Sequence, residues 1–132
     1  MTSSVLMEEI STYCLSKPEA HEDFPFGPQA QVVKVGGKMF ALIFEYQGRA
    51  AINLKCDPLQ AQQLRDVWDD VIAGYHMNKC HWNTVFIDGD VPRSEIERLV
   101  DHAYALVVRG LRKAERTRLE TLHGADTLYC GE

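Results

Sequence analysis

The sequence predicts a single α+β domain in which an antiparallel β-sheet has helices packed on one face. A block of β-rich runs, separated by glycine-containing turns, occupies residues 31–55, and helical apolar periodicity lies on both sides of it. The length of 132 residues is close to the commonest size of one domain. Apolar residues make up 45% and charged residues 25%, which indicates a chain with a buried core and excludes a disordered or collagen-like one. The expected order of elements is α-βββ-α-β-α.

The first element is a helix over residues 4–16. Val5, Ile10 and Cys14 recur at helical spacing, and serines followed by two acidic residues suit a helix start. The helix ends before Pro18. The stretch to residue 30 contains two more prolines, a glycine and two phenylalanines, which is typical of a loop with apolar anchors.

Three strands in a meander are expected next, over residues 31–35, 38–46 and 50–55. Gly36 and Gly37 separate the first two runs, and both can adopt positive φ, which favours a hairpin. Residues 47–49 form the second turn. In the strand over residues 38–46, Phe40, Leu42 and Phe44 alternate with Met39, Ala41 and Ile43, so both faces are apolar and the strand should be central.

The remaining elements follow from caps and periodicity. Asp57 as N-cap and Pro58 at the first helical position predict a short helix of about three turns. Residues 68–79 have no regular pattern, and residues 81–87 predict a strand in which Trp82, Thr84 and Phe86 share a face. A continuous apolar stripe predicts a long helix from residue 92 to residue 111. The domain is therefore expected over residues 1–112, with residues 113–132 as a polar C-terminal extension or tail, of which residues 124–132 are expected to be loose.

The net charge of −5 excludes the strongly basic signature of many nucleic-acid-binding proteins but allows a local basic patch. Residues 31–56 and 92–118 each sum to +3, and they form a positive face if they meet in space. Otherwise these lysines and arginines are ordinary solvent-exposed residues of turns and helix ends, where they complement the helix dipole. No apolar run approaches the roughly 18 residues that a membrane helix needs. The four cysteines lie far apart and no secretory signal pattern is present, so we expect reduced thiols, a cytoplasmic location and no membrane partner.

The densest group of polar and aromatic residues is the run GYHMNKCHWNTV over residues 74–85. It combines hydrogen-bonding groups, a cation and stacking surfaces, which suits phosphates or bases and equally a hydrated protein interface. Its ligand-binding candidates are Tyr75, His76, Asn78, His81, Trp82 and Asn83. Four of them also have an ordinary structural interpretation: Trp82 in the core, the two histidines bonded to backbone carbonyls, and Asn78 as the cap of a turn.

This run is similar to the signature of the MmcQ/YjbR family of small bacterial proteins, of the DUF419 type. The likeness extends to VGGKMFA at residues 35–41, NLKCDP at residues 53–58 and the helix after residue 91, and it covers roughly residues 5–112. Cys80 stands where members often have a basic residue, and Ala73 where a proline is usual. The matched positions of the signature are Gly74, Tyr75, His76, Met77, Asn78, Lys79, His81, Trp82, Asn83 and Thr84. The resemblance implies a frataxin-like (CyaY-like) fold and DNA binding through a double-wing arrangement of hairpins, and it implies no known reaction.

The leading hypothesis is DNA binding, in which basic hairpin wings and the run over residues 74–84 contact the phosphate backbone. The candidate cations are Lys34, Lys38, Arg49, Lys55 and Lys79. Such binding should be weak and salt-dependent, because each neutralised phosphate steepens the salt dependence by about 0.9 logarithmic units.

The alternative hypothesis is a non-enzymatic small-molecule-binding or protein-binding domain that uses the segment from Tyr75 to Trp82 as a pocket. Catalysis is not expected, because Cys80 and His81 are adjacent and point to opposite faces of a strand. A zinc site usually needs four nitrogen or sulfur ligands, and only three cluster here. We therefore expect no enzymatic activity, no cofactor and no metal, with a monomer favoured over an oligomer.

Overall fold

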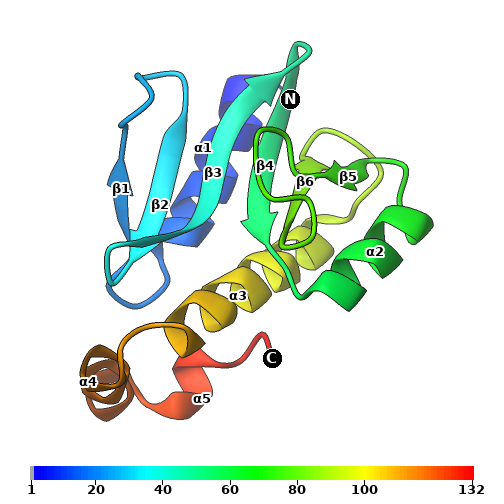
Figure 1. Ribbon diagram of the computed structural model, residues 1–132. Helices are drawn as coiled ribbons and strands as arrows, with labels where there is room; N and C mark the ends of the chain where they lie inside the picture. The colour runs from blue at the N-terminus through cyan, green and yellow to red at the C-terminus, as the bar shows by residue number, and fades with distance from the viewer. Residues whose placement is uncertain (1) are drawn as a thin grey trace.

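The computed structural model describes residues 2–132, which form a six-stranded antiparallel sheet and five helices (Figure 1). The elements are α1 (Ser3–Leu15), β1 (His21–Asp23), β2 (Gln31–Val35), β3 (Lys38–Tyr46), β4 (Arg49–Lys55), α2 (Pro58–Val67), β5 (Val71–Ala73), β6 (Trp82–Phe86), α3 (Arg93–Arg109), α4 (Lys113–His123) and α5 (Ala125–Leu128). The strand order is β1-β2-β3-β4-β6-β5, and α1 and α3 pack against β3 and β4. The predicted α+β class is confirmed. None of the helices within residues 2–132 is long and apolar enough to cross a membrane.

The predicted meander is present as β2, β3 and β4, with β3 in the interior of the sheet. Gly36 and Gly37 form the β2–β3 turn with φ of 57° and 77°, a conformation that other residues adopt only with strain. The predicted cap of α2 is also confirmed, since the Asp57 carboxylate accepts the Gln60 N–H at 3.1 Å. The local signals of turns and helix ends therefore determine these boundaries.

A β-bulge in β3 departs from the simple alternation that the sequence predicts. Val33 pairs with Ala41 and the next residue of β2 pairs with Met39, so Phe40 has no partner on β2. Phe40 and Ala41 consequently both belong to the core under the helices. The Phe40 ring meets the Tyr104 ring edge-on, with 5.4 Å between centroids. The expectation that Phe40 shares a face with Leu42 is therefore wrong.

Two short strands at the edges of the sheet are corrections to the predicted order. β1 lies in the stretch expected to be a loop and pairs with β2. β5 lies within residues 68–79, expected to be irregular, and pairs with β6. Each spans only three residues, too few for a period-2 pattern, and each is ordered by the neighbouring strand with which it pairs.

The C-terminal residues 113–132 form α4 and α5, so the expectation that residues 124–132 are a loose tail is wrong. Three apolar side chains of this segment are buried in the main core: Leu119, Leu128 and Tyr129. The segment is polar on average, and these few spaced residues are sufficient to dock it beside α3.

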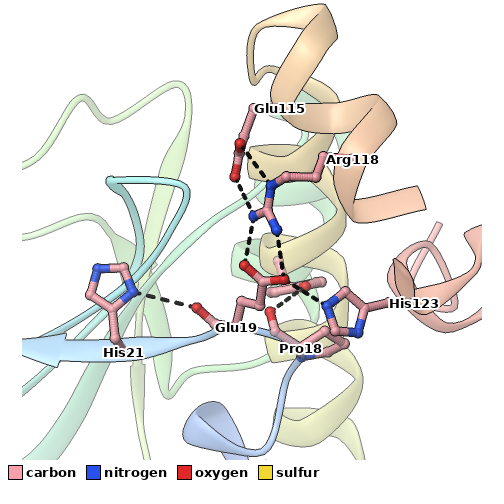
Figure 2. Close-up of polar contacts among 7 residues, drawn as sticks. Pro18, Glu19, His21, Glu115, Arg118 and His123 are labelled. Carbon is pink, nitrogen blue, oxygen red and sulfur yellow. Dashed lines mark hydrogen bonds and ion pairs between the residues drawn. The ribbon is translucent and has the colours of Figure 1, made fainter. Parts of the chain in front are cut away.

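A polar contact also fastens α4 to the loop that follows α1 (Figure 2). The Glu19 carboxylate accepts hydrogen bonds from Arg118 at 2.7 Å and from His123 at 2.8 Å. The hydrogen bonds from Arg118 and from His123 lower the pKa of Glu19 to about 2. The first and last thirds of the chain are thereby joined.

Candidate functional site

The sheet face opposite α1 and α3, called the open face below, carries a second and smaller apolar cluster. All its members come from strands: Leu42, Phe44, Tyr46, Ala51, Ile72 and Phe86. The apolar residues at both alternating positions of β3 are thus explained, because one set packs under the helices and the other lies on the open face.

The segment between β5 and β6, residues 74–81, is held to the open face by a buried polar network. Asn53 of β4 and Thr84 of β6 are register partners, and both side chains are fully buried. The Thr84 hydroxyl donates to Asn53 Oδ1 and accepts the Tyr75 N–H at 2.9 Å. Asn53 Nδ2 donates to the Tyr75 carbonyl oxygen at 3.0 Å. Both backbone groups of Tyr75 are therefore fixed to the sheet.

The start of the same segment has no room for a larger residue. A Cβ at Gly74 would lie 2.7 Å from the Trp82 Cβ and 2.9 Å from the Trp82 carbonyl oxygen. Asn78 Oδ1 accepts the Cys80 N–H at 2.9 Å and forms a turn further along. His76 has φ of 58°, a left-handed conformation that a histidine adopts only when its surroundings hold it there. Residues 74–81 thus have a defined shape before any ligand arrives.

Aromatic rings stack along the open face. The Tyr75 ring lies on the Tyr46 ring with 4.3 Å between centroids and 19° between planes. The centroids of the His76 and Tyr75 rings are 4.1 Å apart, and those of the Phe86 and Tyr46 rings are 5.9 Å apart. The Arg49 guanidinium lies 4.0 Å from the centre of the Phe86 ring. These contacts produce an aromatic surface on which Tyr75 stays 38% exposed.

A cavity of about 470 Å³ lies beside this stack. It is lined by Phe26, Gln29, Ala30, Leu42, Phe44, Glu45, Asn53, Tyr75, His76 and Met77. Phe26 belongs to the loop before β2 and is 63% exposed. Sites for small molecules typically measure roughly 300–1,000 Å³ and combine apolar walls with a few polar groups, as this cavity does.

The predicted ligand-binding candidates separate into two groups. Tyr75 and His76 line the cavity. The others do not line it: Asn78, His81, Trp82 and Asn83. Asn83 is buried on the opposite face of the sheet, where its Nδ2 donates to the Ala61 carbonyl oxygen of α2 at 3.2 Å. Adjacent residues of a strand point to opposite faces, so the predicted candidates of this strand do not all lie on the open face.

The predicted cations do not form one surface. Lys38 begins β3 at one end, whereas Arg49 begins β4 at the other end, opposite Tyr46. At about 3.3 Å per residue, β3 separates the two turns by roughly 26 Å. Lys55 lies at the Lys38 end, because it follows Leu54, the register partner of Ala41.

Three of the five cations already have partners. Lys34 pairs with Asp23 at 3.0 Å, and the Lys79 ammonium donates to the Gly74 carbonyl oxygen at 3.0 Å. Arg49 lies between two carboxylates, at 2.8 and 3.2 Å: those of Asp88 and Asp70. Across residues 2–132, no carboxylate forms an ion pair with the other two, Lys38 and Lys55.

Asn53 was not among the predicted site residues. Its signal in the sequence is a lone amide between Ile52 and Leu54 in an otherwise apolar strand. Burying such a group is unfavourable unless it forms hydrogen bonds, so an amide in this position indicates a hydrogen-bond partner in another part of the chain. The sequence does not show that this partner is the backbone of Tyr75, 22 residues further on.

Metal-binding and nucleophilic groups contribute little to this site. No group of three or more histidine, cysteine, aspartate or glutamate side chains suited to a metal ion occurs within residues 2–132. Burial raises the pKa of Cys14 to about 12 and that of Cys56 to about 11, so both thiols stay protonated at neutral pH. Among the described residues, the cavity is lined mainly by aromatic, aliphatic and amide side chains, with one imidazole and one carboxylate.

Known proteins are similar in sequence to this chain over most of its length. It is similar to the uncharacterized protein YjbR of Escherichia coli strain K12, with 37% identity over 116 residues that span 88% of this chain and 98% of that protein. The uncharacterized protein YbdF of E. coli O157:H7 is 34% identical over 119 residues, which are 90% of this chain and 98% of that protein.

Two solved structures are also similar. Protein DR2400 of Deinococcus radiodurans, a DUF419 domain, has a TM-score of 0.78 and 36% identity over 85% of this chain and 86% of that one. A protein from Pseudomonas syringae has a TM-score of 0.68 and 26% identity over 75% of this chain and 96% of that one. The sequence model of the YjbR family matches residues 15–106, a range that contains every residue lining the cavity. The chain therefore belongs to the YjbR family.

Proposed function

We propose that this chain is a non-enzymatic binding domain for a small molecule with a flat apolar part, and that its site is the cavity on the open face. The main support for this proposal is the cavity of about 470 Å³, in which Asn53 and Thr84 hold the Tyr75 side in place. A wall that is ordered before binding reduces the entropy lost on association. The free, exposed thiols of Cys80 and Cys130 suit a reducing compartment, and we propose the cytoplasm.

The lining residues explain how such a molecule is retained. Phe26, Phe44 and Tyr75 supply aromatic contact, and an aromatic pair contributes about 0.5–1.5 kcal/mol beyond the burial of its area. Gln29, Glu45 and His76 supply the polar side chains available to orient the ligand. Small-molecule sites typically have apolar walls that bind the ligand and a few polar groups that orient it.

The test is an NMR titration of the labelled protein with indole, a neutral flat probe. We expect shifts at the backbone amides around the cavity, including those of Ala30, Phe44 and Met77. Tyr75→Ala should weaken binding about tenfold, because it removes one aromatic wall while the backbone bonds that hold the segment remain. Leu122→Ala, which shortens an exposed apolar side chain of α4, should leave binding unchanged. Absence of localised shifts at millimolar indole, or unchanged binding by Tyr75→Ala, would overturn the proposal.

Nucleic-acid binding is the second candidate function, supported by the cations at one end of the sheet. Lys38 and Lys55 lie at this end and have no ion-pair partner within residues 2–132. A Cβ at Gly36 would lie 2.8 Å from Leu111 Cδ1, so the β2–β3 turn touches the end of α3. Two further cations follow directly in the chain: Arg112 and Lys113. Phosphate contacts here would involve one end of an otherwise acidic protein.

Fluorescence anisotropy of a labelled random duplex tests this second candidate. We expect micromolar binding at low salt that weakens steeply as salt rises. The double variant Lys38→Gln, Lys55→Gln should lose most of this binding, whereas Arg49→Gln, at the other end of β3, should retain it. Absence of binding at low salt, or equal binding by the double variant and the wild type, would exclude this role.

A further inference from the structure

The cavity also has a charge preference. We propose that it selects a ligand whose flat apolar part carries a positively charged nitrogen, such as an aromatic amine. This inference rests on the proposed small-molecule function and specifies the class of ligand. It follows from the Glu45 carboxylate at the sheet edge of the cavity, from two more carboxylates in an adjoining hollow, and from a described lining that contains aromatic rings but no lysine or arginine.

Glu45 lines the cavity at a free part of the sheet edge, where strand alternation places its side chain on the α1 side, opposite that of Phe44. β2 begins at Gln31, which pairs with Ile43, so the last three residues of β3 extend beyond β2. The Glu45 side chain is exposed, and no lysine or arginine within residues 2–132 forms an ion pair with it. Its negative charge is thus uncompensated by a neighbouring cation.

A second hollow, of about 620 Å³, adjoins the cavity and shares Gln29 and Glu45 with it. It lies against α1 and the segment before β2, and its lining adds Glu8 and Glu22. The described residues that line the two hollows thus include three carboxylates and no lysine or arginine. A lining with carboxylates and without lysine or arginine favours a cation over an anion.

The aromatic lining favours the same sign of charge. The faces of Phe26, Phe44 and Tyr75 carry the negative part of the ring quadrupole, which attracts ammonium and guanidinium groups. An anion in the cavity would lose its hydration without gaining a lysine or arginine partner. The nearby Arg49 does not alter this balance, because two carboxylates already engage it. The cavity therefore disfavours phosphate and carboxylate ligands.

Three indoles with similar skeletons and different charges test the preference by NMR titration at neutral pH and low salt. They are tryptamine, which is cationic, tryptophol, which is neutral, and indole-3-propionate, which is anionic. We expect tryptamine to bind about tenfold more tightly than tryptophol, and indole-3-propionate to bind most weakly. Added salt should narrow the difference, because the carboxylates are exposed.

Two charge variants separate the local effect from the total charge. Glu45→Gln should reduce the preference for tryptamine to about twofold while leaving the affinity for tryptophol unchanged. Asp69→Asn removes the same charge from an exposed residue that lines neither hollow, and it should preserve the preference. Both positions are exposed, so both variants should fold. A loss of preference in Asp69→Asn equal to that in Glu45→Gln would assign the effect to total charge and overturn the inference.

The outcomes distinguish this inference from the proposed function. Equal binding of the three probes at the cavity, or tightest binding of the anion, would overturn the charge preference and leave the binding site intact. Failure of all three probes to shift the amides around the cavity would overturn both proposals.

Discussion

Replacing Asn53 with alanine removes the residue that holds the Tyr75 backbone to the sheet. Two hydrogen bonds are lost, one to the Tyr75 carbonyl oxygen at 3.0 Å and one from the Thr84 hydroxyl. Because Asn53 is fully buried, water cannot easily replace it. A lost hydrogen bond that leaves a buried partner unsatisfied destabilises by about 1–3 kcal/mol, so we expect the free energy of unfolding to fall by about 2–4 kcal/mol. At about 3–5 °C per kcal/mol for a chain of this length, Tm should fall by roughly 6–20 °C.

The matched control is Asn83→Ala, on the neighbouring strand and the opposite face. Asn83 is also buried, but it forms one hydrogen bond, to the Ala61 carbonyl oxygen, and its Oδ1 has no partner within residues 2–132. Its removal should lower the free energy of unfolding by about 1 kcal/mol and leave the cavity unchanged. Urea denaturation measures both losses, and hydrogen exchange of the Tyr75 amide measures the opening of the segment.

Asn53→Ala should accelerate exchange of the Tyr75 amide far more than Asn83→Ala does, because only the first variant disturbs the network around that amide. If Asn53→Ala has the wild-type urea midpoint and the wild-type exchange rate at Tyr75, the network does not hold the segment and the reasoning is refuted. A loss of stability without faster exchange at Tyr75 would place the effect elsewhere in the core.

Other regions give equally direct expectations. Gly131→Ala should release the C-terminal residues, because the added Cβ would lie 2.2 Å from the Asp101 carbonyl carbon; limited proteolysis that cuts variant and wild type alike would contradict this. Leu119→Ala should lower the free energy of unfolding by about 2–5 kcal/mol in urea, whereas a negligible loss would mean that α4 is not packed on the core. The hydrogen bonds from Arg118 and His123 hold the pKa of Glu19 at about 2, below its ordinary value of 4.5, so these contacts stabilise the fold above pH 4.5 and their contribution is lost as the pH falls towards 2. The decline of Tm over that range should be shallower in Glu19→Gln, and parallel declines would contradict the pairing; the effect is modest because the pair is exposed.

Residues whose conformation depends on near neighbours were predictable from the sequence. The glycine pair at residues 36–37 indicates a hairpin, the Asp57 cap and Pro58 mark the start of α2, and the apolar stripe identifies α3. Part of the candidate site is predictable in the same way, since Tyr75 and His76 lie in a run rich in ligand-binding residue types. These signals are local because caps, turns and helical periodicity involve residues a few positions apart.

The cavity itself was not predictable from these patterns. Its lining comes from the loop before β2, from β3 and β4, and from the segment after β5, and Asn53 and Thr84 hold the last of these to the sheet. Strand pairing likewise decides that Lys38 and Arg49 lie at opposite ends of β3 rather than on one basic surface.

The sequence by itself determined the α+β class, the meander, the long third helix and the family resemblance. Only the tertiary structure decided the bulge at Phe40, the edge strands, the docking of residues 113–132 and the shape of the open face. The physical reason is range: a cap or a turn is stabilised within a few residues, whereas a cavity, an edge strand or a docked helix is stabilised by contacts between residues far apart in the chain. Such contacts leave only weak signals in sequence order, and the buried amide of Asn53 is one of them.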